Sequence, residues 1–291
     1  MKKWNMIIDV ALCENCNCCF LSCKDEYVGN SFEGYSEEQS RHGQRWMNIE
    51  RKERGSGSLI DVAYLPKPCM HCDEPACLKK SKNGSVSKRK DGIVMIDPKK
   101  AKGDKDLANA CPYGAIWWND VLNVPQKCTF CAHLLDEGLS TTRCTQACPT
   151  GALKVIRVSD SEIKEIIKSE SLEELHPEFG TKPHVFYKNL YRYFACFISG
   201  SISYENKKLK ECAESAKVRL LKDDKLVSET ITDYFGDFKF DKIPANSGKY
   251  TIDIKFQQYS KTIPVEITDS VYLKDIELEP VLNNLTKQQT S

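Results

Sequence analysis

The sequence predicts two parts of different fold class: a cysteine-rich α+β domain over residues 1–193 and an all-β sandwich over residues 194–282. Thirteen of the fifteen cysteines lie before residue 150, and only two follow it. From about residue 194 the chain consists of short alternating apolar and polar runs, separated at regular intervals by turn residues. This pattern is typical of a small antiparallel sandwich. The polar end of the chain, residues 283–291, is expected to be a disordered tail.

Composition limits the function classes. The 291 residues suffice for about two domains, and the formal net charge of +1 gives no electrostatic reason to expect a nucleic-acid partner. No apolar run reaches the roughly 18–20 residues that a membrane span needs. The N-terminal apolar run is interrupted at Asp9 and is followed by no small-residue cleavage site, so we expect a β-strand leading into Cys13 rather than a secretory signal. We therefore expect a cytoplasmic protein.

One helix is predicted between the two parts. Within residues 159–176, Ile163, Ile166 and Ile167 recur at helical spacing, and Ser159 or Asp160 is placed to be the N-cap. We expect this segment to act as a helical connector.

The cysteines fall into three groups with ligand spacing and one separate residue. The groups are Cys13, Cys16, Cys19 and Cys23; Cys69, Cys72 and Cys77; and Cys128, Cys131, Cys144 and Cys148. Cys111 stands apart and, like Cys148, is followed by proline, as is the last cysteine of bacterial ferredoxin runs. An odd number of cysteines in a long chain without a secretory signal favours metal ligation over disulfides.

The spacing has a geometric reason. A tight loop with two-residue gaps can place three thiolates on one face of a cubane cluster, and the fourth ligand must come from elsewhere in the fold. In two-cluster ferredoxins the fourth cysteine of each run therefore binds the other cluster. This rule predicts three 4Fe–4S clusters in a ferredoxin-like domain, with the ligand sets Cys13, Cys16, Cys19 and Cys148 (set 1); Cys23, Cys128, Cys131 and Cys144 (set 2); and Cys69, Cys72, Cys77 and Cys111 (set 3).

All four ligands of a possible fourth cluster are absent from the sequence. The same spacing would require cysteines at four positions that instead hold Ser81, Ala101, Asp104 and Leu107. All four belong to one cluster under the crossed-pairing rule, so their absence leaves set 3 whole. Twelve cysteines are then ligands, and Cys18, Cys196 and Cys212 are left over.

Three alternatives remain open at this point. Structural zinc also uses four thiolates in C-x2-C pairs, although it seldom combines three close cysteines with a remote one followed by proline. Cys18 could replace Cys19 as a ligand. A 3Fe cluster would result if one ligand were unused.

These motifs resemble a known family. The cysteine domain is similar to the iron–sulfur subunits of the molybdopterin oxidoreductase (dimethyl-sulfoxide-reductase) superfamily, and within it to the three-cluster small subunits of the transhydroxylase branch. The stretches that carry the resemblance are "RHGQRWMNIERKERG" (41–55), "KPCMHCDEPAC" (67–77), "DGIVMIDPKKAKG" (91–103), "CPYGAIWWN" (111–119), "QKCTFCAHLLD" (126–136) and "GTKPHVFYKNLYR" (180–192). The later stretch "TDYFGDFKFD" (232–241) resembles transthyretin-like or carboxypeptidase-regulatory-like domains.

The resemblance implies a heterodimer. A large catalytic subunit would hold molybdenum bis-pterin guanine dinucleotide and act on polyhydroxylated aromatic rings. The alternative is that the partner is another molybdopterin oxidoreductase, such as a resorcinol-type hydroxylase. This chain would transfer electrons and would carry no catalytic residue and no cofactor beyond the clusters. His71 and His133 are interpreted as cluster neighbours rather than acid–base catalysts. Tyr113, Trp117 and Trp118 could border an electron path, although packing beside a cluster is the simpler interpretation.

Ten lysines and arginines against three aspartates occupy residues 79–105. They are interpreted as a solvated loop, with partner docking as the alternative.

Three functional hypotheses follow. The chain could carry electrons between a molybdenum partner and an external acceptor, serve mainly as a structural and redox-poising partner, or act alone as a polyferredoxin. The sandwich is expected to be an interaction or stabilising module.

Overall fold

The computed structural model describes residues 1–57 and 59–280, and the predicted disordered tail, 283–291, lies outside them. Contacts divide the chain into two compact units. The first combines residues 1–51 with 63–193, and the second combines residues 52–62 with the chain from Phe194 onward. In the described residues, no helix is long and apolar enough to cross a membrane. The cytoplasmic location stays a prediction.

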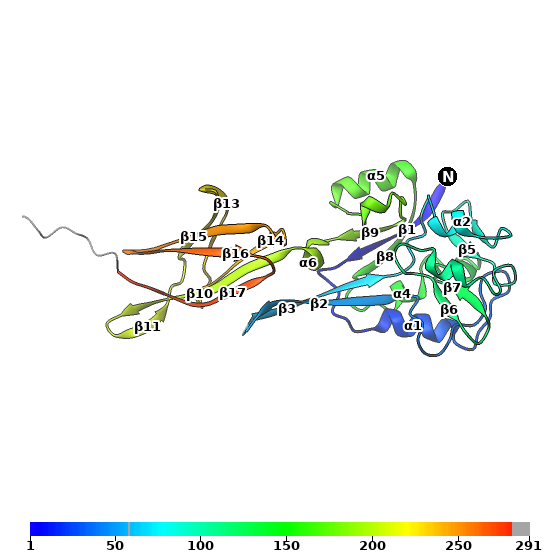
Figure 1. Ribbon diagram of the computed structural model, residues 1–291, viewed down its shortest axis with the longest axis horizontal. Coiled ribbons are helices and arrows are strands. Elements are labelled where there is room, and N and C mark those ends of the chain that lie inside the picture. The colour runs from blue at the N-terminus through cyan, green and yellow to red at the C-terminus, as the bar shows by residue number, and fades with distance from the viewer. Residues whose placement is uncertain (58, 281–291) are drawn as a thin grey trace, which may run out of the picture. The chain divides into compact units, whose positions relative to one another are not determined.

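A three-stranded sheet organises the first unit. Strand β1 (Lys2–Asp9) lies at its centre, antiparallel to β8 (Leu153–Ser159) and parallel to β9 (Val185–Lys188). The predicted N-terminal strand is therefore confirmed. Helix α5 (Asp160–Ser169) follows β8 directly, and it lies against the sheet in Figure 1. Its Ile163 is buried with Ile7 of β1 and Phe186 of β9.

The predicted helix forms but is shorter than residues 159–176. Ser159 is its N-cap and forms a capping box with Glu162, which satisfies two backbone N–H groups at the helix start. The helix ends at Ser169, and Glu173 then pairs with Tyr187 of β9 in an isolated bridge. The segment is thus part of the first unit's core rather than a free connector.

The remaining elements of the first unit are short, because the cysteine-bearing loops interrupt them. They are α1 (Cys18–Tyr27), α2 (Ala76–Lys80), the paired strands β4 (Val86–Lys88) and β5 (Val94–Ile96), η1 (Lys105–Asn109), the paired strands β6 (Trp117–Asn119) and β7 (Val124–Gln126), α3 (Ala132–Asp136), α4 (Arg143–Gln146), η2 (Pro177–Phe179) and α6 (Tyr191–Phe194). The main core packs buried cysteines among large apolar side chains such as Met6, Trp46 and Tyr187.

The second unit contains two sheets around one apolar core. The sheet order β13–β12–β15–β16 comprises Lys225–Ile231, Lys217–Lys222, Gly248–Phe256 and Tyr259–Ile267. In the other sheet, β10 (Cys196–Asn206) pairs with β11 (Leu209–Cys212), β14 (Asp237–Ile243) and β17 (Val271–Leu278). The expectation of a wholly antiparallel sandwich is wrong at one pair, because β17 runs parallel to β10. Alternation along a strand identifies its buried face but carries no information on the direction of its neighbour.

A hairpin of strands β2 (Asn48–Ser56) and β3 (Leu59–Lys67) contributes residues 52–62 to the second unit. Arg54 on this tip is fully buried and forms ion pairs with Asp61 and Asp241. Gly55 has a φ of +88°, and a Cβ there would lie 2.7 Å from the Phe197 ring. The predicted first domain, residues 1–193, includes this tip, whereas the structure packs the tip with the second unit. Sequence patterns could not predict this packing, because the contacts join residues far apart along the chain.

Candidate metal centre

All fifteen cysteines lie in described residues, and all are free thiols. The predicted ligands sit on loops and at the starts of short helices, except Cys23, which lies in the middle of α1. Asn17, Phe130 and Cys131 adopt positive φ values, which turn the backbone sharply around the ligand loops. No three cysteine, histidine or acidic side chains in the described part of the chain are grouped closely enough to hold a single metal ion.

Set 1 combines Cys13 and Cys16 of the first loop and Cys19 of α1 with Cys148, which lies two residues after the end of α4. Burial raises the pKa of the Cys13 thiol, and the nearby thiols of Cys148 and Cys16 raise it further. Burial also raises the pKa of Cys19 to about 12. Cys148 differs: burial raises its pKa, but hydrogen bonds from the Thr150 hydroxyl and neighbouring backbone amides outweigh burial, so the net pKa is lowered. Its environment thus favours the thiolate that a metal requires.

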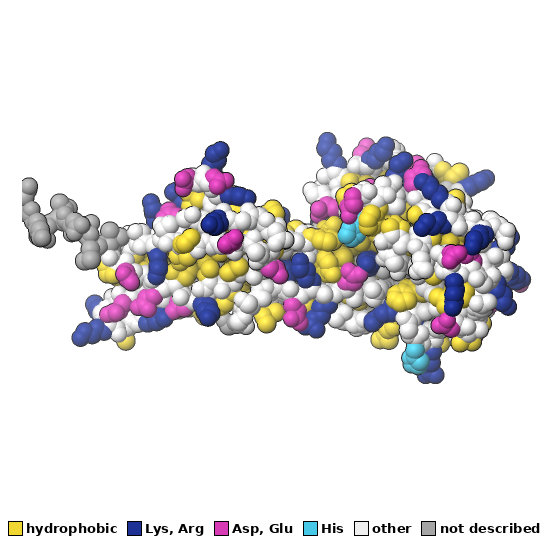
Figure 2. Space-filling model, in the orientation of Figure 1, with side chains coloured by type: hydrophobic (Ala, Val, Ile, Leu, Met, Phe, Trp, Pro, Cys, Tyr) yellow, Lys and Arg dark blue, Asp and Glu magenta, His cyan; other side chains and the backbone are white. Residues whose placement is uncertain are grey.

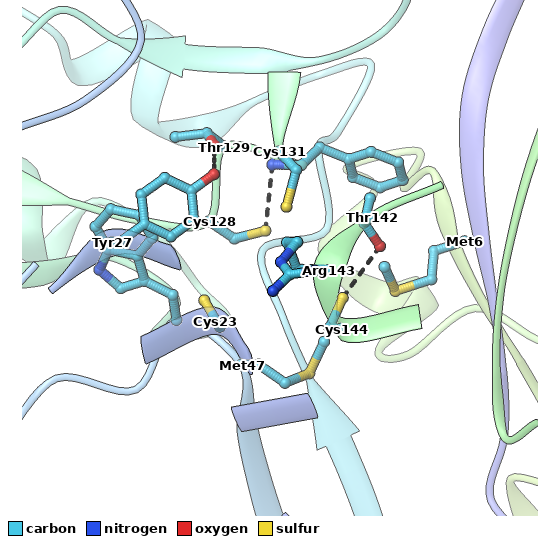
Figure 3. Close-up of a pocket in the computed structure, with 12 residues that line it drawn as sticks. Met6, Cys23, Tyr27, Met47, Cys128, Thr129, Cys131, Thr142, Arg143 and Cys144 are labelled. Atoms are coloured by element: carbon cyan, nitrogen blue, oxygen red, sulfur yellow. Dashed lines mark hydrogen bonds between the residues drawn. The ribbon is translucent and has the colours of Figure 1, made fainter. Parts of the chain in front are cut away.

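Set 2 lines a small pocket. Figure 3 shows the sulfur atoms of Cys23, Cys128, Cys131 and Cys144 turned toward the same space. Met6, Tyr27, Trp46, Met47 and Phe130 supply most of the remaining wall, so the space is shielded by apolar side chains. Four convergent free thiols in an apolar pocket fit the donor set of an iron–sulfur cluster.

Hydrogen-bond donors surround the set 2 thiols. The backbone N–H of Phe130 donates to Cys128 Sγ at 3.3 Å, and Thr142 Oγ1 lies 3.2 Å from Cys144 Sγ. Burial raises the pKa of Cys131 to about 12 despite the opposing effect of the Tyr27 hydroxyl, which hydrogen-bonds with Thr129. Sequence reasoning missed Tyr27 and Thr142. The position of Thr142, two residues before a ligand, is the only local signal for either residue.

Set 3 combines Cys69 and Cys72, which precede α2, with Cys77 in α2 and Cys111, which follows η1. Burial raises the pKa of Cys72 to about 12, and the thiols of Cys69, Cys111 and Cys77 raise it as well. The pKa of Cys77 is raised to about 11, chiefly by burial. The Thr181 hydroxyl faces this set and hydrogen-bonds with Tyr113 Oη at 2.6 Å.

Set 2 neighbours each of the other two sets. Cys144 of set 2 lies close enough to Cys19 of set 1 to raise its pKa in addition to the effect of burial. On the other side, Cys69 of set 3 raises the pKa of Cys128, again in addition to burial. Among the described thiols with a shifted pKa, no such interaction joins sets 1 and 3. The spacing of the motifs alone does not give this order.

An apolar cluster occupies the region where the fourth set is missing. Ala101 and Leu107 are fully buried there, together with Val86, Val94, Ile96, Ala110 and Ile116. Ser81 ends α2 and donates to the Leu78 carbonyl at 2.9 Å, while Asp104 lies 3.7 Å from Lys82. Packed apolar side chains therefore stand at two of the four positions, and polar side chains at the other two.

The three remaining cysteines lie apart from these sets or at their edge. Cys196 is buried in the second unit, with its thiol 3.6 Å from Asp269, and Cys212 is exposed on β11. Cys18 is partly exposed, and its Sγ lies 4.0 Å from the Cys16 carbonyl. The buried position of Cys19 favours it over Cys18 as the ligand of set 1.

The histidines singled out in the sequence are packed rather than free. His133 is buried, stacks on Phe32 and lies 2.9 Å from Glu26. His71 is fully buried in the loop of set 3, where its Nδ1 accepts from the Val94 N–H at 3.1 Å. Burial lowers the pKa of His71 well below its usual value, so its ring is neutral. These contacts agree with the interpretation of both as neighbours of the sets.

The aromatic residues singled out in the sequence are packed or half-buried, and most basic residues of 79–105 form surface ion pairs. Tyr113 is buried beside set 3, whereas Trp117 and Trp118 are half-buried on β6. Six of the ten basic residues in 79–105 form ion pairs with acidic side chains: Lys79, Lys82, Lys88, Arg89, Lys99 and Lys100. Figure 2 shows basic and acidic side chains interspersed over the visible face. These pairs favour the solvated loop over a docking surface.

Known proteins match this chain in sequence. Residues 60–158 match the 4Fe-4S dicluster domain family. The pyrogallol hydroxytransferase small subunit of Pelobacter acidigallici is 43% identical over 271 residues, which cover 91% of this chain and 96% of that protein. One subunit of the tetrathionate reductase of Salmonella typhimurium is 32% identical over 194 residues, covering 65% of this chain and 73% of that protein. One subunit of the sulfite dehydrogenase of Allochromatium vinosum is 31% identical over 195 residues, covering 63% of this chain and 81% of that protein.

These matches confirm the resemblance that the cysteine motifs indicate. The 4Fe-4S domain and the related subunits support an iron–sulfur, electron-transferring role beside a catalytic partner. The chain belongs to the family of molybdoenzyme iron–sulfur subunits that includes the pyrogallol hydroxytransferase small subunit.

Proposed function

We propose that this chain holds three 4Fe–4S clusters on sets 1, 2 and 3 and transfers electrons for a molybdenum enzyme of the pyrogallol–phloroglucinol transhydroxylase type. The observation that supports this most directly is the gathering of twelve thiols into three sets that follow the crossed pairing. When bound, such a cluster takes up and passes on single electrons. The chain's own contribution is to supply thiolates, exclude water and direct hydrogen bonds at the sulfur atoms.

The substrate chemistry is assigned to the partner. In the proposed heterodimer the large subunit holds molybdenum bis-pterin guanine dinucleotide and acts on a polyhydroxylated aromatic ring. The high identity to a hydroxytransferase subunit over nearly the full length supports this choice over a resorcinol-type hydroxylase or another molybdopterin oxidoreductase. It also weighs against an independent polyferredoxin. Purification with a stoichiometric large subunit is expected, and purification as a lone stable chain would count against the proposal.

The cluster assignment is tested by single cysteine substitutions in the purified complex. Wild-type protein should contain about twelve irons in this chain, four for each of three clusters. Cys111→Ala removes the remote ligand of set 3 and should lower the count to about eight irons, or to about eleven if a 3Fe cluster persists. Cys212→Ala alters an exposed thiol outside the sets and should leave the count unchanged. Full iron in Cys111→Ala would exclude this pairing.

A second role fits the same relative. Transfer of a hydroxyl group between rings is redox-neutral overall, so the clusters could poise and stabilise the partner without net electron flow. Rapid-freeze EPR during turnover separates the two roles. A cluster signal that rises and decays at the catalytic rate supports electron transfer, whereas a signal that stays constant through turnover supports poising.

For the second unit we propose a transthyretin-like or carboxypeptidase-regulatory-like module with an interaction or stabilising role. Its "TDYFGDFKFD" stretch forms the turn into β14, where Asp233 Oδ1 accepts from the Phe235 and Asp237 N–H groups at 2.9 Å. Gly236 is needed in this turn, since a Cβ there would lie 2.3 Å from the Ile202 carbonyl.

A further inference from the structure

Lys127 is the one buried lysine in the described part of the chain, with 3% of its surface exposed. It lies between the end of β7 and Cys128 of set 2. Its Nζ donates to the Val94 carbonyl at 2.5 Å and to the Cys128 carbonyl at 3.0 Å. Within the described residues, no carboxylate lies within the 4.0 Å of an ion pair with this ammonium group.

A buried ammonium group without a counter-charge is costly. Two carbonyls satisfy two of the three Nζ donors but supply no full negative charge. The nearby His71 cannot supply negative charge either, because an imidazole is neutral or cationic. The charge of Lys127 must therefore be balanced by another group.

Thiols of two different sets surround this lysine. Cys128, the next residue, belongs to set 2, and its carbonyl accepts one of the lysine's hydrogen bonds. Set 3 also lies near: Val94, whose carbonyl accepts from Lys127, donates its N–H to His71 in the loop between Cys69 and Cys72 and packs in one apolar cluster with Cys77 and Cys111. The ammonium group thus lies where the two sets approach each other.

We propose that Lys127 is the shared counter-ion of the clusters held by sets 2 and 3. This inference rests on the proposed function, because it requires clusters at both sets. A cluster with four thiolate ligands is anionic and gains a further negative charge on reduction. A fixed buried cation therefore stabilises the reduced form more than the oxidised form and raises the reduction potential. Lys127 would thereby favour electron occupancy of the clusters at sets 2 and 3.

The test compares charge-removing and charge-keeping variants of the complete complex. Lys127→Met removes the charge, Lys127→Gln removes it but keeps a hydrogen-bond donor, and Lys127→Arg keeps it. Lys164→Met, on an exposed position of α5, removes the same charge away from the sets and is the matched control. Iron is counted first, and the potentials are then measured by EPR-monitored redox titration.

We expect Lys127→Gln and Lys127→Met to lower the one-electron reduction equilibrium constant of at least one cluster tenfold or more, which corresponds to about 59 mV. The reduction potentials of the clusters in Lys127→Arg and Lys164→Met should stay near the wild-type values. Unchanged potentials in a fully loaded Lys127→Gln, or an equal shift in Lys127→Arg, would overturn the inference. Failure of the proposed function is separate, because it would appear as a low iron count in the wild type.

A second measurement applies if the neutral variants do not assemble. Wild-type protein labelled with [15N]lysine is reduced and examined by pulsed EPR for hyperfine coupling from a nearby nitrogen. A 15N coupling in the wild type that disappears in Lys127→Arg supports the inference. Absence of the coupling in the reduced, fully loaded wild type refutes it.

Discussion

Single residues decide how many sets this chain can complete. Ser81 is polar and ends a helix, whereas Ala101 and Leu107 are fully buried in an apolar cluster. None of the four positions that a fourth set would need holds a thiol, and two of them hold packed apolar side chains. Restoring one thiol cannot recreate the site, because the other three ligands and the empty volume are absent.

Ser81→Cys alone should therefore leave the chain at about twelve irons. The new thiol would replace a hydroxyl that bonds the Leu78 carbonyl at the end of α2. Iron and sulfide analysis of the purified complex checks this expectation. A rise to about sixteen irons on this single change would show that the crossed-pairing assignment is wrong.

Arg54 is a second residue with a large expected effect. Removal of one partner of a buried ion pair costs about 3–5 kcal/mol, and we expect the lower end for Arg54→Met because Asp61 and Asp241 are partly exposed. Pulse proteolysis in urea measures the loss for the second unit. Lys239→Met removes a more exposed partner of the same carboxylates and should cost at most about 1 kcal/mol. Equal effects of the two variants would contradict this role of burial.

At the scale of elements, the capping of α5 links sequence to fold. Ser159 ends β8 and begins α5, so one side chain fixes the point where the strand becomes a helix. The helix then covers the central sheet through Ile163. Its stability depends on this cap and on the apolar face, since an isolated ten-residue helix is marginal in water.

Ser159→Ala should destabilise the start of α5 by about 1 kcal/mol, because the capping box is lost. Hydrogen exchange of residues 160–163, followed by mass spectrometry, should become about fivefold faster if exchange occurs by local opening. Ser169→Ala, at the last residue of the same helix, is the control and should leave exchange at the helix start unchanged. Equal protection in Ser159→Ala and wild type would contradict the role of the cap.

At the scale of the whole molecule, the two units have separate cores, but the hairpin tip joins the second unit by its packing. The predicted ligands of all three sets lie in the first unit. Loss of the second unit is therefore expected to affect the hairpin tip and not the sets.

Deletion of residues 195–291 should leave the iron content intact. It should also make the tip, residues 52–62, sensitive to protease, because Arg54 and Gly55 lose their partners Asp241 and Phe197. Iron analysis and limited proteolysis of the truncated chain test both outcomes. A version whose tip is replaced by a short Gly-Ser turn should keep its iron and lose the new cleavage site. Loss of all iron on truncation would contradict the independence of the two units.

The sequence by itself determined the features that depend on local spacing. These are the positions of the cysteine loops, the first strand, a helix start at Ser159 or Asp160 and most strands of the second unit, since turn chemistry and alternation are short-range signals. The predicted ligation itself stays a prediction until iron is counted.

Tertiary structure alone decided the order of the sets, the burial of Lys127 between two of them, the parallel pairing of β17 and the placement of the hairpin tip. Each of these depends on contacts between segments far apart along the chain. The spacing of residues within a motif carries no information about such contacts.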